Sequence, residues 1–338
     1  MNSLERIAAA AAFGTPDRVP VVAQVFGHAG VLAGVAVGDY VRDGALLARC
    51  QLAALAHYGY DAVFALMDVN VEAEALGARL RWPAERYPSI ETYPLRPDRL
   101  DFARLATPDP AHAGRMPELL QAARLLRDAV GDEVLVVGCV LGPMTLASQL
   151  LGFEAAIYLA IDEPEQFGRL LDFATEVATR FGIAQIQAGA HLPLVFDPSA
   201  SPELLPTQFY REFLLPRLAR LFGTFKAAGA ALNWLHTAGA AESILPFYPL
   251  VGVDIANIDY AVDPERALRA LPHTCLDGNL KPLAFVCDTP ADIACAAARL
   301  LDLFAARGGF ILSSGCEIPP EARPENITAM VMAARRVG

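Results

Sequence analysis

Residues 117–140 decide the fold, and they read PELLQAARLLRDAVGDEVLVVGCV. Residues 117–130 form a predicted helix, and residues 134–140 form an unbroken apolar run that is rich in valine. A continuous apolar run, rather than an alternating one, is what a strand buried on both faces of a parallel sheet requires. A helix beside such a strand is the repeating unit of an α/β fold.

The same alternation continues in both directions along the chain. Helical stretches separate the short apolar or β-branched runs, and a long one, residues 164–189, carries Phe167, Leu170 and Val177 at near-helical spacing. The predicted strands are residues 19–25, 62–67, 134–140, 192–196, 231–236, 252–255, 274–277 and 309–313. This alternation of strand and helix predicts a closed parallel (β/α)8 TIM barrel that occupies residues 1–338 as a single domain.

An irregular segment, residues 69–110, interrupts this pattern after the second strand. Residues 79–82 alternate as the edge strand of a hairpin would, and prolines recur from Pro83 to Pro110. We interpret the segment as an insertion, long enough to form a lid or to pair subunits in a homodimer.

Composition excludes several classes of protein. Hydrophobic residues make up 54% of the chain and charged residues 19%, which excludes global disorder. A net charge of −11 argues against a nucleic-acid partner. No apolar run reaches the roughly 18 residues of a membrane span. The six cysteines form no CxxC pair and the first residues do not resemble a signal peptide, so we expect reduced thiols in a cytoplasmic protein.

Polar residues follow nearly every predicted strand. Barrel enzymes place their chemistry at the carboxyl ends of the strands, so these residues are predicted to form a site. Simpler readings stay open, because Asp68 suits a helix N-cap, Asp197 opens a turn and His236 suits a packed core histidine. The candidates, in chain order, are Gln24, His28, Asp68, Asp197, Ser199, His236, Asp254, Asn257, Asp277, Asn279, Cys316 and Glu317.

Several motifs resemble the uroporphyrinogen decarboxylase superfamily, in order and over nearly the whole chain. They are LERI at residues 4–7, GTPDRVP at 14–20, VEAEALG at 71–77, DPSASP at 197–202 and Gly278-Asn279. The closing SGCEIPP at residues 314–320 is similar to the zinc-containing corrinoid methyltransferases of that superfamily.

The loop after the first strand separates the two branches. The resemblance implies an arginine-rich loop there in the decarboxylases, which pairs with the carboxylates of a porphyrinogen. Residues 19–41 contain no arginine, although Asp68 occupies the position of that branch's catalytic aspartate. Several acidic substituents cannot be held without cations, so the methyltransferase branch is favoured. A decarboxylase-like lyase and a non-catalytic tetrapyrrole-binding member remain the alternatives.

The methyltransferase resemblance also implies a zinc site. Its pattern is His-x-Cys after the fifth strand and Cys in the loop after the eighth, and this chain has His236 and Cys316 but Ala238. Catalytic zinc usually takes three protein ligands. Three accounts are open: a carboxylate such as Glu317, Asp254 or Asp277 completes the site, the metal is weak or absent and His236 acts as acid or base, or the activity has been lost or changed.

The resemblance therefore implies methyl transfer between a corrinoid, usually carried by a separate protein, and a small donor or acceptor. A methyl ether, a methylamine, a thiol and a folate all remain candidates, and the missing cysteine disfavours the thiol. The expected catalytic residues are Asp68 and His236, the substrate-binding residues Gln24, His28, Asp197, Ser199 and Asn279, and the metal ligands His236, Cys316 and Glu317.

Overall fold

Eight parallel strands form the centre of the molecule in the computed structural model, which describes residues 1–97, 100 and 105–335. The order around the ring is β1 (Val21–Val22), β10 (Phe310–Ser314), β9 (Cys275–Leu280), β8 (Ile255–Ile258), β7 (Trp234–Thr237), β6 (Leu192–Phe196), β5 (Leu135–Leu141) and β2 (Ala62–Ala65). Every neighbouring pair is parallel. The predicted (β/α)8 barrel is confirmed.

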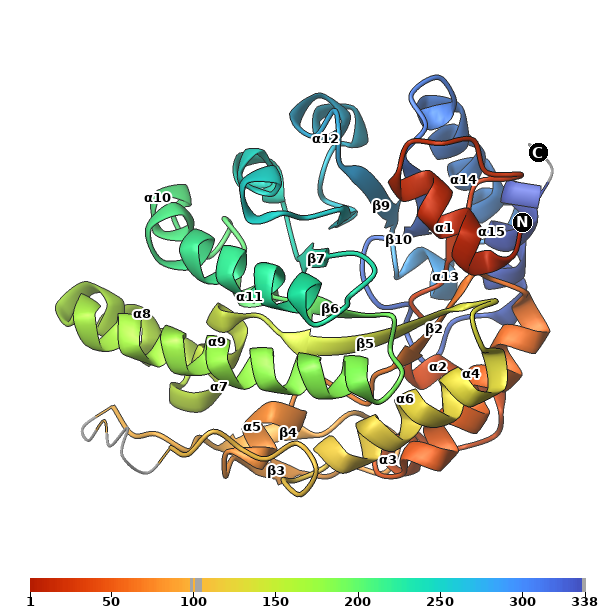
Figure 1. Ribbon diagram of the computed structural model, residues 1–338. Coiled ribbons are helices and arrows are strands. Elements are labelled where there is room, and N and C mark those ends of the chain that lie inside the picture. The colour runs from red at the N-terminus through yellow and green to blue at the C-terminus, as the bar shows by residue number, and fades with distance from the viewer. Residues whose placement is uncertain (98–99, 101–104, 336–338) are drawn as a thin grey trace.

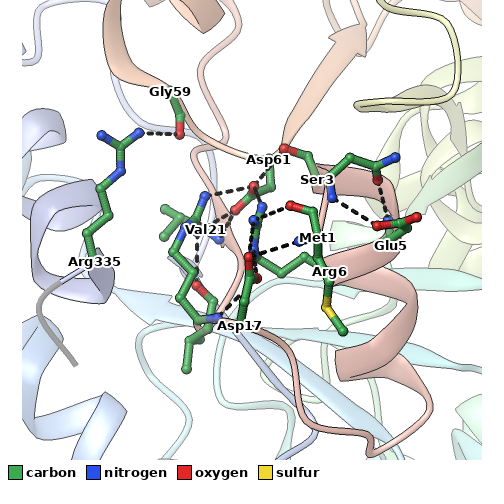
Figure 2. Close-up of polar contacts among 12 residues, drawn as sticks. Met1, Ser3, Glu5, Arg6, Asp17, Val21, Gly59, Asp61 and Arg335 are labelled. Carbon is green, nitrogen blue, oxygen red and sulfur yellow. Dashed lines mark hydrogen bonds and ion pairs between the residues drawn. The ribbon is translucent and has the colours of Figure 1, made fainter. Parts of the chain in front are cut away.

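Asp61 spans the seam between β1 and β2, which do not pair with each other as strands. Its backbone N–H donates to the carbonyl of Val21 at 2.8 Å, and its carboxylate accepts the Val21 N–H at 2.8 Å. The same buried carboxylate is paired with Arg6 at 2.7 Å and Arg18 at 2.8 Å (Figure 2). The seam is therefore closed by the backbone N–H and the carboxylate of Asp61, with the guanidinium groups of Arg6 and Arg18 paired to that carboxylate.

Arg6 extends this network to the start of the chain. It lies on α1 (Ser3–Ala11) and also binds Asp17 at 2.6 Å, while Ser3 donates to Asp61 at 2.8 Å (Figure 2). Residues 4–7 and 14–20, which carry part of the family resemblance, thus hold α1 against the barrel seam. Their role is in closing the fold.

Long amphipathic helices surround the strands (Figure 1). They are α4 (Gly44–Tyr58), α6 (Met116–Val130), α9 (Pro164–Gln187), α11 (Leu215–Ala227), α14 (Pro290–Ala305) and α15 (Pro324–Arg335). In α9, Phe167, Leu170, Leu171 and Phe181 are fully buried, as their helical spacing predicts. The shorter helices are α2 (Gly27–Leu32), α3 (Val37–Tyr40), α5 (Val71–Ala75), α7 (Pro143–Leu151), α8 (Phe153–Asp162), α10 (Thr207–Phe209), α12 (Pro264–Ala270) and α13 (Ala284–Cys287).

Helices α7 and α8 are joined by Gly152, which has a φ of +94°. Glycine adopts such a backbone conformation readily, and it allows the two helices to bend by 104°. The bent pair together has the length and composition of a membrane span. Among the described residues, no single helix does.

The insertion after β2 is confirmed as a hairpin outside the ring of strands (Figure 1). Its strands β3 (Arg79–Arg81) and β4 (Ser89–Thr92) are antiparallel. The Trp82 ring packs against the guanidinium groups of Arg42, at 4.5 Å, and Arg115, at 4.7 Å. Residues 98–99 and 101–104 of the predicted insertion lie outside the described residues. Its role as a lid or a subunit contact stays a prediction.

Candidate functional site

A cavity of about 160 Å³ lies at the end of the barrel where the strands have their carboxyl ends. We call this end of the barrel the mouth. The walls of the cavity come from the segments that follow β1, β2, β6 and β10, from the end of β7 and from the hairpin. Sites of barrel enzymes occupy this end. The lining residues are Phe26, Leu66, Met67, Asp68, Val69, Asn70, Tyr87, Pro88, Phe196, Pro198, His236, Cys316 and Glu317.

A larger hollow of about 360 Å³ lies where the chain enters β1 and β10, at the opposite end of the barrel. Phe13, Arg18 and Arg307 are among its lining residues, which include no histidine or cysteine. Arg18 is already paired with Asp61, and Arg307 binds backbone carbonyls. We therefore place the chemistry at the smaller cavity, where a histidine and a cysteine meet.

His236 and Cys316 are brought together at this cavity, although they lie 80 positions apart in the chain. His236 lies in β7 and Cys316 follows β10. The Nε2 of His236 is 3.6 Å from the Sγ of Cys316. Both residues were predicted to lie in one site because each follows a barrel strand.

The strand register also sets Asn257 beside His236, and Asp277 beside Asn257. The amide nitrogen of Asn257 lies 2.5 Å from the Asp277 carboxylate, 3.2 Å from the Asp277 carbonyl and 3.3 Å from the Ser314 carbonyl. All three partners are acceptors, which fixes the amide orientation and directs Oδ1 toward His236, 2.5 Å from Nδ1.

This orientation determines the tautomer of His236. Because Nδ1 faces an acceptor, we assign the ring proton to Nδ1, which leaves a lone pair on Nε2. Burial lowers the pKa of His236, so the ring is neutral. Burial also raises the pKa of the Cys316 thiol to about 11. The pair at the cavity is therefore a neutral thiol beside an imidazole nitrogen that can accept a proton.

A zinc ion would need a further donor at this pair. Among the described residues, no group of three or more His, Cys, Asp or Glu side chains is arranged to hold a metal. Glu317 accepts a hydrogen bond from Tyr87, whose oxygen in turn accepts the Gly27 N–H at 2.6 Å. Burial raises the pKa of Glu317 to about 7. The described residues do not complete a catalytic zinc site, and zinc stays a prediction.

Asp68 lines the cavity as a paired carboxylate. It binds Arg115 at 2.5 Å, and it also accepts the Asn70 N–H at 2.8 Å in a local turn. Arg115 is shared with Glu74, at 2.6 Å. Both oxygens of this carboxylate therefore already have partners within the protein. The catalytic role predicted for Asp68 stays a prediction.

Three of the predicted substrate-binding residues hold loops together around the mouth. Gln24 donates to the Ser314 carbonyl at 3.2 Å, and Asn279 donates to the Val262 carbonyl at 2.8 Å. The ring nitrogens of His28 contact the Tyr58 hydroxyl at 2.7 Å and the Pro320 carbonyl at 3.1 Å. None of the three lines the cavity.

Asp197 and Ser199, which follow β6, contact the start of α7. Asp197 accepts the Thr145 N–H and the Thr145 hydroxyl, each at 2.8 Å, and so binds the first turn of that helix from the end of β6. Ser199 contacts the Ser148 hydroxyl at 3.2 Å. Neither lines the cavity, and substrate binding by these two residues stays a prediction.

Sequence reasoning did not single out Tyr87, and it named Asn257 only among the polar residues that follow the predicted strands. Tyr87 comes from the hairpin, and nothing in the sequence pattern indicated that it reaches the cavity. Asn257 had a usable signal, because a polar residue within an apolar strand of a barrel points either inward or toward a partner. We read it as lying beyond the strand, whereas it lies inside β8.

Comparisons with known proteins identify the family of the chain. The profile of the family described as Uroporphyrinogen decarboxylase (URO-D) matches residues 2–337. A methylcobamide:CoM methyltransferase, MtaA, of Methanosarcina barkeri is 30% identical over 85% of this chain and 83% of its own. A uroporphyrinogen decarboxylase of Aromatoleum aromaticum is 29% identical over 87% of this chain and 83% of its own length.

A solved structure, a methyltransferase from Methanosarcina mazei, superimposes with a TM-score of 0.91 at 26% identity. That comparison covers 100% of this chain and 99% of the other. The barrel fold, the family motifs along the sequence and the matched profile all indicate the same family. The chain belongs to the uroporphyrinogen decarboxylase (URO-D) family and, within it, is similar to the corrinoid-linked methyltransferases.

Proposed function

We propose that this protein moves a methyl group between a corrinoid, carried by a separate protein, and a small molecule in the mouth cavity. The observation that carries the proposal is the His236–Cys316 pair, with Nε2 and Sγ 3.6 Å apart at the cavity wall. Similarity to corrinoid-linked methyltransferases over most of the chain supports it.

The corrinoid supplies the cobalt that carries the methyl group. The chain's own residues bind and orient the small molecule and handle its proton. An acceptor with an S–H or N–H group loses a proton as it gains a methyl group. The free lone pair on Nε2 of His236 is the base that takes this proton, and in the reverse direction the same nitrogen returns it. Asn257 keeps Nε2 unprotonated, because its Oδ1 accepts the hydrogen bond from Nδ1–H and so holds the ring proton at Nδ1.

The apolar walls contribute by excluding water. Phe26 and Phe196 line the cavity with their rings edge to face, 6.2 Å between centroids. Holding a small acceptor against such walls aligns it with the methyl carbon and removes competing water.

A decarboxylase reaction on a porphyrinogen is less well supported. Such a substrate carries several carboxylates, and no arginine or lysine is present among the described residues that line the cavity. Asp68, which matches the decarboxylase aspartate, is already paired with Arg115. No observation favours a non-catalytic tetrapyrrole-binding role.

An optical experiment tests the proposal. Purified protein is mixed with cob(I)alamin and a panel of methyl donors, and separately with methylcobalamin and a panel of thiol, amine and folate acceptors. The methyl–cobalt absorption is expected to grow with one class of donor or to fall with one class of acceptor. The rate should drop by about a hundredfold in His236→Ala, the size of effect usual for a lost general base.

Cys316→Ser should also slow the reaction, and Cys287→Ser is its matched control because Cys287 is an exposed free cysteine outside the cavity. Equal rates in all variants would place the chemistry elsewhere. No response in either panel, with the corrinoid presented on a carrier protein as well as free, would refute methyl transfer.

A further inference from the structure

We infer that the small molecule accepted by the mouth cavity carries no negative charge, so that thiols and thioethers bearing a sulfonate or carboxylate are excluded. This inference rests on the proposed methyl transfer and names the substrate class of that site. It separates the chain from relatives such as the methylcobamide:CoM methyltransferase of Methanosarcina barkeri. Three features of the cavity support it: the charges that line it, the hydrogen-bond donors near it, and its walls.

The charged groups at the cavity are carboxyl groups. Asp68 and Glu317 both line it, and no arginine or lysine does among the described lining residues. Arg115, the cation behind Asp68, is divided between Asp68 and Glu74, and it also donates to the Val41 carbonyl at 2.7 Å. A sulfonate or carboxylate is normally held by a guanidinium fork or an ammonium group. Here it would meet carboxyl groups instead.

Backbone N–H groups at helix N-termini are the other common anion ligands. At three helix termini near this mouth, backbone N–H groups already have acceptors within the protein. The N–H of Gly27, the first residue of α2, donates to Tyr87, and the N–H of Asn70, just before α5, donates to Asp68. The first turn of α7 is bound by Asp197. None of these donors is free for an incoming anion.

The remaining walls are apolar and close together. Leu66 and Met67 join the two phenylalanine rings and two prolines around a space of about 160 Å³. Pockets for drug-sized ligands are larger, roughly 300–1,000 Å³. Such walls favour a compact molecule with an apolar surface, and they would strip water from an ionic group without replacing it.

A matched ligand series tests the inference by binding alone. The series is CH₃–S–CH₂–CH₂–X with a ¹³C-labelled methyl group, where X is hydroxyl, ammonium or sulfonate, so that only the charge changes. Dissociation constants for the protein are measured by titration of the methyl signal. We expect the sulfonate to bind at least about tenfold more weakly than the hydroxyl compound.

A cation can be added at Val69 without being buried, because Val69 lines the cavity and is 41% exposed. Val69→Arg places a cation at the rim, and Val69→Met is the matched control of similar length without charge. In Val69→Arg, the affinity for the sulfonate should rise about tenfold relative to the affinity for the hydroxyl compound. In Val69→Met, this ratio of affinities should stay as it is in the wild type.

Two results would overturn the inference: a sulfonate that binds the wild-type protein as tightly as the hydroxyl compound, and a series in which no member binds. Failure of the proposed function has a different signature. In that case the binding order holds, and the methyl–cobalt absorption does not change with any member of the series or with its free thiol.

Discussion

Ala238 is the residue that most clearly separates this site from the pattern it resembles. It stands two positions after His236, where the zinc-containing methyltransferases are expected to have a cysteine. Ala238→Cys should supply a third donor beside His236 and Cys316. We therefore expect the zinc content to rise to about one ion per chain, the outcome usual for three protein ligands. Metal analysis after dialysis against zinc-containing and then zinc-free buffer measures it.

Ala238→Ser is the control, because a serine hydroxyl is a poor zinc ligand at neutral pH. The wild-type protein should retain well under one zinc ion per chain. Full zinc occupancy in the wild type would mean that a carboxylate or another donor completes the site. In Ala238→Cys, absence of zinc would mean that the loop after β7 does not bring position 238 toward the pair.

The sequence was sufficient to place His236 and Cys316 together, because each follows a barrel strand and such ends converge at one face. The sequence was insufficient to predict the contact of Asn257 with His236 or the position of Tyr87 at the cavity. The role of Asn257 depends on which side of β8 it faces, and the end of that strand was misjudged. Tyr87 reaches the cavity by the fold of an irregular loop, for which no periodic pattern exists.

At the scale of elements, α7 is held at its start by the carboxylate of Asp197, the residue that follows β6. This carboxylate is fully buried, and burial raises its pKa from 3.8 to about 6. The folded state therefore binds this proton more tightly than the unfolded state does. The contribution of the group to stability is fully present below about pH 4 and is lost as the pH rises through about 6.

Asp197→Asn removes this titration while keeping an oxygen that can accept from Thr145. We expect the free energy of unfolding of the wild type, relative to Asp197→Asn, to fall by up to about 3 kcal/mol between pH 4 and pH 7. Urea unfolding at a series of pH values measures the difference. A difference that is flat over this range, or that grows with pH, would contradict the assignment.

Most elements follow from local patterns. β6 has the predicted bounds, residues 192–196, because it is a clean apolar run between polar segments. β8 begins at Ile255, three positions after the predicted start, since Gly252 and Val253 form a turn in which the Val253 N–H binds the Tyr248 carbonyl. Its last residues include a buried asparagine, which the apolar pattern could not assign to a strand.

At the scale of the whole molecule, the barrel is closed by Asp61. The predicted strand at residues 19–25 is reduced to Val21 and Val22, and no sequence pattern indicated that a carboxylate would bridge the gap. Asp61→Asn would leave Arg18 and part of Arg6 without their buried partner. Breaking a buried ion pair costs about 3–5 kcal/mol, so we expect a loss of about that size in the free energy of unfolding.

Asp172→Asn is the matched control. Asp172 also pairs with two arginines, Arg217 at 3.1 Å and Arg220 at 2.9 Å, but its side chain is 50% exposed. Exposed pairs contribute less than about 1 kcal/mol. Denaturant unfolding of both variants compares them directly. Equal losses in the two variants would mean that the seam does not depend on the Asp61 carboxylate.

The packing of Trp82 against Arg42 and Arg115 makes its fluorescence a natural probe of the hairpin. The chain has two tryptophans, and the other, Trp234, is fully buried in β7. Trp234→Phe would leave a single fluorophore on the hairpin, in contact with the same guanidinium group that holds Asp68 at the cavity. Its emission would then report in real time on the contact between the hairpin and Arg115, without any dye attached.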